Sequence, residues 1–366
     1  MQYLLPVVFL LPFLAHRCCA QQSYFTIEKD GQTYSLNQQM NEQGVNGAAQ
    51  VIIRNFEIDT TIYLGYADKQ KNKSVNKHTL FQMGSMTTPI TKFAVVKLIS
   101  EGKIELDAPV NQYLKDWQIP TKKFTQDRPV TVRDLLLKQR GFNEVYKPKG
   151  YVAGSALPSW EQIMGGKKPS NIPAMHLKKD SSGDNSSIAA DLILQRLLED
   201  IHGRTFANII ETEVFLPLEM THSIIAAELT NDQKVNAAVG YEEDNRPVKG
   251  GAYVFPELAV SGLWSTPVDY AKFVLHVFKA AKGIDNSMIT QSLAQQSVTA
   301  QRDYYSLIFH HDDNVYWGGA PKGFYSQFAG HAEKGWIVVG CTNRELGWQF
   351  VNRTLNPIGI KYAQRN

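Results

Sequence analysis

Ser85 is the residue best suited to covalent chemistry, because it directly precedes a segment with helical spacing. A serine hydroxyl is a weak nucleophile at its own pKa, so a nearby base must take its proton. The residue three positions later would lie on the same helix face. That residue is Thr88, whose hydroxyl cannot act as a general base near neutral pH. Lys92 shares the face but lies roughly 10 Å further along the helix axis.

Both residues also have a structural interpretation. A lone serine at a helix start is more often a capping residue than a nucleophile. Lys92 can pack its aliphatic stem while its amine reaches solvent or a partner.

Other groups of reactive side chains are less organised. His310 to Asp313 contain metal-capable side chains, but neighbours on a strand point to opposite faces, so we expect a polar loop and no metal. No metal, phosphate-loop or dinucleotide motif predicts a cofactor. Cys341 lies in an apolar run typical of a buried strand, which favours a structural thiol.

The elements that must position Ser85 follow from hydrophobic spacing. We expect helices over residues 35–43, 85–101, 130–141, 189–201, 206–215 and 267–282. Strands are expected over residues 46–54, 60–66, 304–310, 323–330 and 336–342, with residues 55–59 linking a hairpin. Strands at both ends and helices between them predict an α/β protein of the α+β type, with one antiparallel sheet built from the two termini.

Several segments together resemble the β-lactamase-related serine hydrolases, which include class C β-lactamases, D-alanyl-D-alanine carboxypeptidases and esterases. The matching segments, in order, are residues 81–91, 98–114, 130–136, 197–203, 215–221, 261–273 and 317–324. The resemblance implies a β-lactamase/transpeptidase-like fold with a helical region inserted into the sheet. It places a sheet part at roughly 21–80 and 250–366, and a helical part at roughly 81–249.

The family's chemistry is acyl transfer, and this chain departs from it at three positions. Ser85 stands at the nucleophile position, but Thr88 replaces the base lysine. Ser186 falls where the family has its tyrosine, and a shifted alignment over residues 183–185 supplies no phenol either. Trp317 replaces the histidine or lysine of the third motif, and we expect it to fill the vacated site rather than stack on a ligand.

Neighbouring residues complete the expected site. Gly318 and Gly319 keep a strand edge open to a substrate backbone. Tyr146 and Tyr151 lie in a preceding loop and are expected to be structural or at the rim. Lys138 begins the sequence Lys-Gln-Arg-Gly where many relatives have His-Thr-Ser-Gly.

Residues 1–20 predict a cleaved signal peptide, since the apolar run is too short to span a bilayer. Acylation at Cys18 or Cys19 is the less favoured alternative. The formal net charge of +3 argues against a nucleic-acid partner, and no later run is long enough for a membrane span. We therefore expect a secreted or periplasmic domain over residues 21–366.

Three functions remain open on these grounds. The leading hypothesis is a pseudoenzyme that binds a peptide, a cell-wall-like ligand or a protein partner. The second is a serine hydrolase that uses Ser85 with Lys92, a loop tyrosine or another non-standard base. The third is a structural or assembly protein whose cleft is filled by Trp317.

Overall fold

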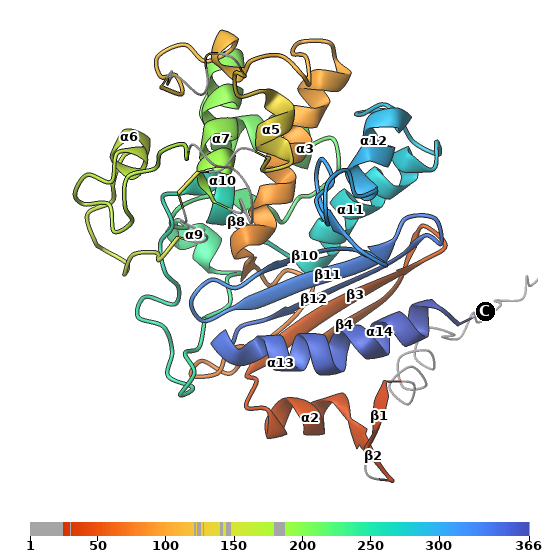
Figure 1. Ribbon diagram of the computed structural model, residues 1–366. Coiled ribbons are helices and arrows are strands. Elements are labelled where there is room, and N and C mark those ends of the chain that lie inside the picture. Colours follow the sequence, from red (N-terminus) through yellow and green to blue (C-terminus); the bar gives the residue numbers. More distant parts are fainter. Residues whose placement is uncertain are drawn as a thin grey trace, which may run out of the picture.

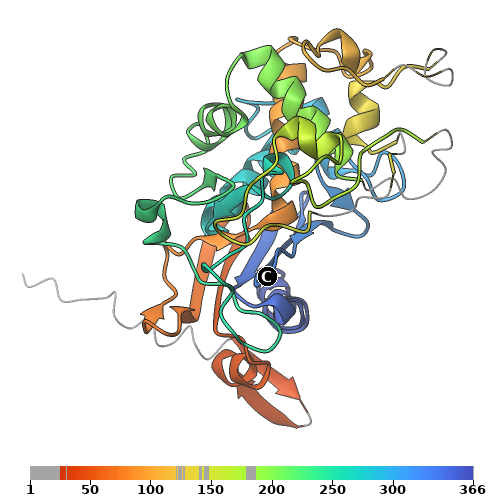
Figure 2. The same ribbon diagram turned by 90° about the vertical axis from the view of Figure 1, so that its left-hand side faces the viewer.

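The computed structural model describes residues 25–29, 31–120, 122, 126, 128–139, 142–143, 148–178 and 187–365. A seven-stranded antiparallel sheet separates a large helical region from a smaller layer of terminal helices (Figure 1). Figure 2 shows the helical region on one side of this sheet, with α2 (Leu36–Glu42) and the β1–β2 hairpin (Thr26–Lys29 and Gln32–Ser35) on the other.

The sheet joins the two ends of the chain. Its order is β5-β4-β3-β12-β11-β10-β9. The N-terminal strands are β3 (Gly47–Arg54), β4 (Glu57–Asp68) and β5 (Lys73–Ser74). The C-terminal strands are β9 (His310–His311), β10 (Val315–Gly319), β11 (Tyr325–His331) and β12 (Trp336–Thr342). The pairing of β12 with β3, with Val339 opposite Val51, therefore depends on residues almost 300 positions apart.

Both faces of the central strands are covered, so their side chains alternate between two cores. In β3, Val51 belongs to the core shared with the helical region, and Ile52 belongs to the core on the opposite face. The second core is closed by α13 (Trp348–Phe350) and α14 (Asn356–Ala363), which lie along the sheet in Figure 1. Two-sided burial explains why β12 reads as a continuous apolar run.

The helical region is built around α3 (Thr87–Ser100), against which α7 (Ala189–His202) and α10 (Leu258–Ser261) pack. Shorter helices surround this centre: α5 (Val132–Leu136), α6 (Trp160–Met164), α8 (Phe206–Ile210) and α9 (Asn231–Lys234). α11 (Pro267–Ala281) and α12 (Gln291–Val298) complete the layer, and α11 contacts β3 and β12. In the parts of the chain that are described, no helix is long and apolar enough to cross a membrane.

The expected fold class is confirmed, with differences at individual elements. The predicted strand over residues 304–310 is wrong except for His310, because Ser306 bonds to the backbone of Ser297 and Phe309 and holds an irregular turn. The predicted helix over residues 130–141 is shorter, since the chain leaves helical geometry at Lys138 with a φ of 50°. The hairpin turn contains only Asn55 and Phe56, both with positive φ, as a two-residue hairpin of type I′ requires.

Candidate functional site

Ser85 lies in a tight turn between a short strand and the central helix. The strand β6 (Phe81–Gln82) pairs with β8 (Leu263–Ser265), and a 3-10 turn over Gly84–Met86 leads directly into α3. Gly84 has a φ of +53°, and a Cβ there would lie 2.6 Å from Pro321 Cδ. The turn therefore requires glycine next to Ser85, which stays partly exposed at the helix start.

The first turn of α3 carries hydroxyl groups and no amine. Thr87 donates to the carbonyl of Gly84 and accepts from the amide of Leu263, so its hydroxyl fixes the turn against β8. Thr88 is only 2% exposed. The position that would hold a base for Ser85 is thus occupied by a buried threonine, as the sequence indicates.

Strand β10 packs directly against this turn. A Cβ on Gly319 would lie 2.0 Å from the carbonyl oxygen of Met83 and 3.0 Å from the amide nitrogen of Ser85. A Cβ on Gly318 would meet no atom closer than 3.6 Å. Only Gly319 is therefore required for the close approach of strand and turn, although both glycines border the space beside Ser85.

Trp317 lies in the interior beside Ser85. Its indole Nε1 donates to the backbone oxygen of Ser85 at 2.8 Å, and the side chain is 6% exposed. The imidazole of His310 packs against the indole with 4.0 Å between the ring centroids and an interplanar angle of 40°. The indole is thus held at the site by a hydrogen bond and a ring contact.

Lys92 lies behind Trp317, and its expected access to solvent is wrong. The residue is fully buried, and its Nζ has no hydrogen-bond partner among the described residues. Burial, with the positive charge of Lys138, lowers the pKa of Lys92 to about 7. Nζ lies 5.1 Å from the centre of the Trp317 ring, a position that favours a cation, but the lowered pKa indicates that desolvation outweighs this attraction.

Lys138 and Asp191 form a buried ion pair that sequence reasoning missed. Lys138 Nζ lies 3.0 Å from Asp191 Oδ2, and both side chains are almost completely buried. Lys138 follows the C-terminal end of α5, and Asp191 lies in the first turn of α7. The available signal was an aspartate in the first turn of α7, a helix whose buried residues are mostly apolar, since buried carboxylates require a partner.

Two cavities meet at Ser85. The larger, of about 310 Å³, is bordered by uncharged residues that include Ser85, Phe255, Ser261, Gly318 and Tyr325. The smaller, of about 190 Å³, is bordered by Ser85, Thr88, Lys138, Asp191, His310 and Trp317. One side of the serine therefore faces neutral groups, and the other faces the Lys138–Asp191 pair.

The remaining predicted residues are distributed as follows. Ser186 and Tyr146 lie outside the described residues. Tyr151 is a structural residue, since its hydroxyl accepts from the amide of Asn171 at 2.9 Å and its backbone bridges to Val254. Cys341 is buried in β12, and burial raises the pKa of its thiol to about 12, which fits the expected structural role.

His310 belongs to the site, contrary to the expected polar loop. Burial and the charges of Lys92 and Lys138 lower the pKa of His310 to about 3, so its imidazole is neutral. Tyr305, which the sequence analysis did not select, borders the same cavity and packs edge-on against His310. Among the described residues, no three His, Cys, Asp or Glu side chains form a group that could hold a metal ion.

This arrangement of turn, central helix and strand agrees with the comparisons to known proteins. The family described as Beta-lactamase matches residues 35–356, and the chain belongs to this family. It is 27% identical over 223 residues to the putative penicillin-binding protein PbpX of Bacillus subtilis, covering 61% of this chain and 52% of that protein.

Two further relatives carry different activities in their names. Esterase EstB of Burkholderia gladioli is 27% identical over 193 residues, covering 50% of this chain and 48% of the esterase. The teichoic acid D-alanine hydrolase of Staphylococcus aureus is 23% identical over 254 residues, covering 68% of this chain and 58% of the hydrolase. The chain thus spans about half the length of the curated relatives it matches.

Solved structures confirm the fold. The octameric penicillin-binding protein homologue from Pyrococcus abyssi superposes with a TM-score of 0.70 at 20% identity, over 89% of this chain and 75% of that one. FmtA from Staphylococcus aureus superposes with a TM-score of 0.68 at 18% identity, over 88% of each chain.

Proposed function

We propose that this protein is a β-lactamase-fold binding protein that does not turn over its ligand. The observation that carries the proposal is that no base among the described residues hydrogen-bonds to the Ser85 hydroxyl. The helix position that would hold one is Thr88, the amine of Lys138 is paired with Asp191, and the amine of Lys92 is buried behind Trp317. A serine without a base is a poor nucleophile.

The neutral cavity beside Ser85 is the proposed binding site. In the sheet, β9 pairs with Val315 and Tyr316 of β10, and this pairing does not extend to Gly318. An extended peptide or a cell-wall-like fragment with amide groups can pair with such a strand edge. The uncharged walls favour a ligand segment without a charge at this point.

The test is the intact mass of the mature protein after incubation with a penicillin and, separately, with a fluorophosphonate. We expect no covalent adduct with either reagent. A stoichiometric adduct that disappears in Ser85→Ala would refute the proposal, because it would show that the hydroxyl is still activated.

A second candidate function is hydrolysis with a relocated base. It is favoured by one observation: the side chain of Lys138 borders the same 190 Å³ cavity as Ser85. If this function holds, ester or lactam hydrolysis is lost in Ser85→Ala and in Lys138→Met, while Lys138→Met remains folded by circular dichroism. Absence of hydrolysis in the unaltered protein rejects it.

We also propose that the protein is exported with removal of residues 1–20. Expression with the complete N-terminal segment and mass measurement of the exported protein tests this. A mass equal to that of a chain starting at Gln21 supports the proposal, and retention of residues 1–20 in the exported protein contradicts it.

A further inference from the structure

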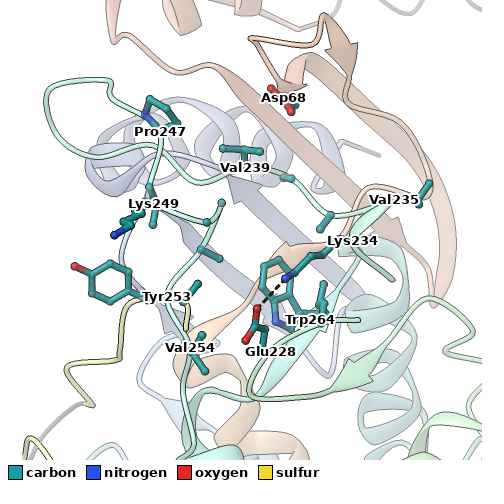
Figure 3. A pocket seen from close by; sticks show the side chains of 18 of the residues that line it. Asp68, Glu228, Lys234, Val235, Val239, Pro247, Lys249, Tyr253, Val254 and Trp264 are labelled. Atoms are coloured by element: carbon teal, nitrogen blue, oxygen red, sulfur yellow. Dashed lines mark hydrogen bonds and ion pairs between the residues drawn. The ribbon is translucent and has the colours of Figure 1, made fainter. Parts of the chain in front are cut away.

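A cavity of about 580 Å³ is lined by residues other than Ser85 and its neighbours. Figure 3 shows the side chains that border it. Its walls come from three stretches of chain, at residues 68–73, 227–239 and 247–254, together with Ala153 and with Trp264 of β8. A volume of this size is within the range of small-molecule sites, about 300 to 1,000 Å³.

Small residues keep this cavity open. Ala227, Ala237, Ala238, Gly250, Gly251 and Ala252 all border it. Gly251 has a φ of +89°, and a Cβ there would meet only Val239 Cγ2, at 3.9 Å. Larger side chains at these positions would occupy part of the cavity.

Positively charged side chains outnumber negatively charged ones at the walls of this cavity. Four lysines border the cavity, at positions 71, 73, 234 and 249, against two carboxylates, Asp68 and Glu228. Lys71 and Lys234 pair with Asp68 and Glu228 at 3.3 and 2.8 Å, and Figure 3 shows the latter pair near Trp264. Lys73 donates to the carbonyl oxygens of Val235 and Ala237.

Two groups at the walls have no partner among the described residues. Lys249 makes no ion pair or hydrogen bond there, so its charge is not compensated. Trp264 is 4% exposed, and its indole Nε1 is a buried donor without an acceptor. Buried polar groups are normally hydrogen-bonded, so an orphaned donor at a cavity wall indicates that an acceptor belongs there.

This cavity is separate from the Ser85 site. Tyr253 and Val254 border the 580 Å³ cavity, whereas the next residue, Phe255, borders the 310 Å³ cavity beside Ser85. One extended segment thus forms a wall of each. The two cavities share no bordering residue.

We propose that the 580 Å³ cavity binds an amphipathic organic anion, with an apolar body against the alanine and valine walls and a carboxylate or phosphate near the lysines. The excess of lysines supplies the charge complementarity, and the apolar walls supply the hydrophobic contact. A fatty acid and an alkyl phosphate share this chemistry, and the test distinguishes them.

The test compares four probes with the same ten-carbon chain: decanoate, decyl phosphate, decylamine and decanol. Binding is measured by isothermal titration calorimetry on the mature protein. We expect at least one anion to bind about tenfold more tightly than decanol and decylamine. The ratio of decanoate to decyl phosphate affinity identifies the preferred head group.

Variants locate the site. Ala252→Phe places a ring in the cavity and should weaken anion binding more than tenfold, while Lys249→Glu should weaken anion binding about tenfold and leave decanol binding unchanged. Lys361→Glu, on the exposed side of α14, is the matched charge control. If Ala252→Phe does not fold, as judged by its thermal melting curve, Ala227→Leu replaces it.

Equal affinity for the anions and the other two probes overturns the proposal. Anion binding that survives both Ala252→Phe and Lys249→Glu also overturns it. Ser85→Ala should leave anion binding unchanged, because Ser85 does not border the 580 Å³ cavity. The proposal for this cavity can therefore fail or hold independently of the function proposed for the Ser85 site.

Discussion

At the scale of single residues, burial determines which groups near Ser85 carry a charge. Lys92 has a pKa lowered to about 7 and His310 a pKa lowered to about 3, both chiefly by desolvation. Lys138 lies in contact with Asp191, so an ion pair compensates its burial. All three side chains can carry a positive charge. Their surroundings decide whether each one does so in the folded protein.

Thr88→Lys alone should not restore strong activity. The second and third motifs would still lack their usual residues, and Trp317 would still bind the backbone of Ser85. Hydrolysis of a chromogenic cephalosporin and of a nitrophenyl ester should stay within about tenfold of the background of Ser85→Ala. Robust turnover by the single variant, absent when Ser85→Ala is added, would show that the remaining site is competent.

Lys92→Met should stabilise the protein, and more so at low pH. The pKa of Lys92 is about 7 in the folded protein, and the ordinary pKa of a lysine is 10.5, so between these values the unfolded chain binds the proton that the folded chain lacks. Stability contributed by this group therefore rises with pH from 7 to 10.5, and the cost of the buried charge is greatest below pH 7. We expect a gain on the order of 3 kcal/mol at pH 6.

The measurement is urea unfolding of both proteins between pH 5.5 and 10. The difference between the two curves isolates Lys92 from Glu257, whose raised pKa of about 7 lowers stability as the pH rises from 4.5 to 7. A difference that is independent of pH would contradict the assigned pKa.

At the scale of elements, the site depends on how closely strand β10 approaches the turn before α3. Gly319 allows that contact, whereas a Cβ on Gly318 would make only ordinary van der Waals contacts, the nearest at 3.6 Å. The two adjacent glycines thus differ in whether the packing requires glycine. The sequence alone does not show which of them is required.

Gly319→Ala should be strongly destabilising, and Gly318→Ala should not. The added Cβ at position 319 would overlap the carbonyl oxygen of Met83, which is backbone and cannot rotate away. We expect a loss of about 3 kcal/mol or more for Gly319→Ala and less than about 1 kcal/mol for Gly318→Ala, from urea unfolding. Equal losses for the two variants would show that the strand and the turn are not in contact.

At the scale of the whole molecule, the two ends of the chain meet in the centre of the sheet. Strand β12 pairs with β3, and α14 covers both strands on the face opposite the helical region. The second core therefore includes residues from before position 53 and after position 335.

Truncation after Leu355, which removes α14, should destabilise the entire domain and not only its C-terminal end. The loss of apolar contact with β3 and β12 should cost on the order of 3 kcal/mol or more. Removal of residues 364–366 alone is the matched control and should have little effect. The measurement is thermal unfolding followed by circular dichroism, and a separate low-temperature transition in the truncated protein would contradict the expectation.

The sequence by itself determined the fold class, most helices and the central strands. The spacing of apolar residues and the length of each segment distinguish amphipathic helices such as α7 and α11 from apolar strands such as β12. A helix buries one face and a central strand buries both, so their apolar residues recur differently along the sequence. It also identified Thr88 and Trp317 as departures from the family, since the surrounding motifs leave little freedom in alignment.

Only the tertiary structure decided how those residues interact. The Lys138–Asp191 pair and the packing of Lys92 against Trp317 join segments more than 50 residues apart, and the contact of His310 with Trp317 bridges two paired strands. Local patterns do not encode such contacts, because each depends on how separate helices and strands pack. The 580 Å³ cavity has the same origin, since its small residues reveal an empty space only when three distant stretches of chain face one another.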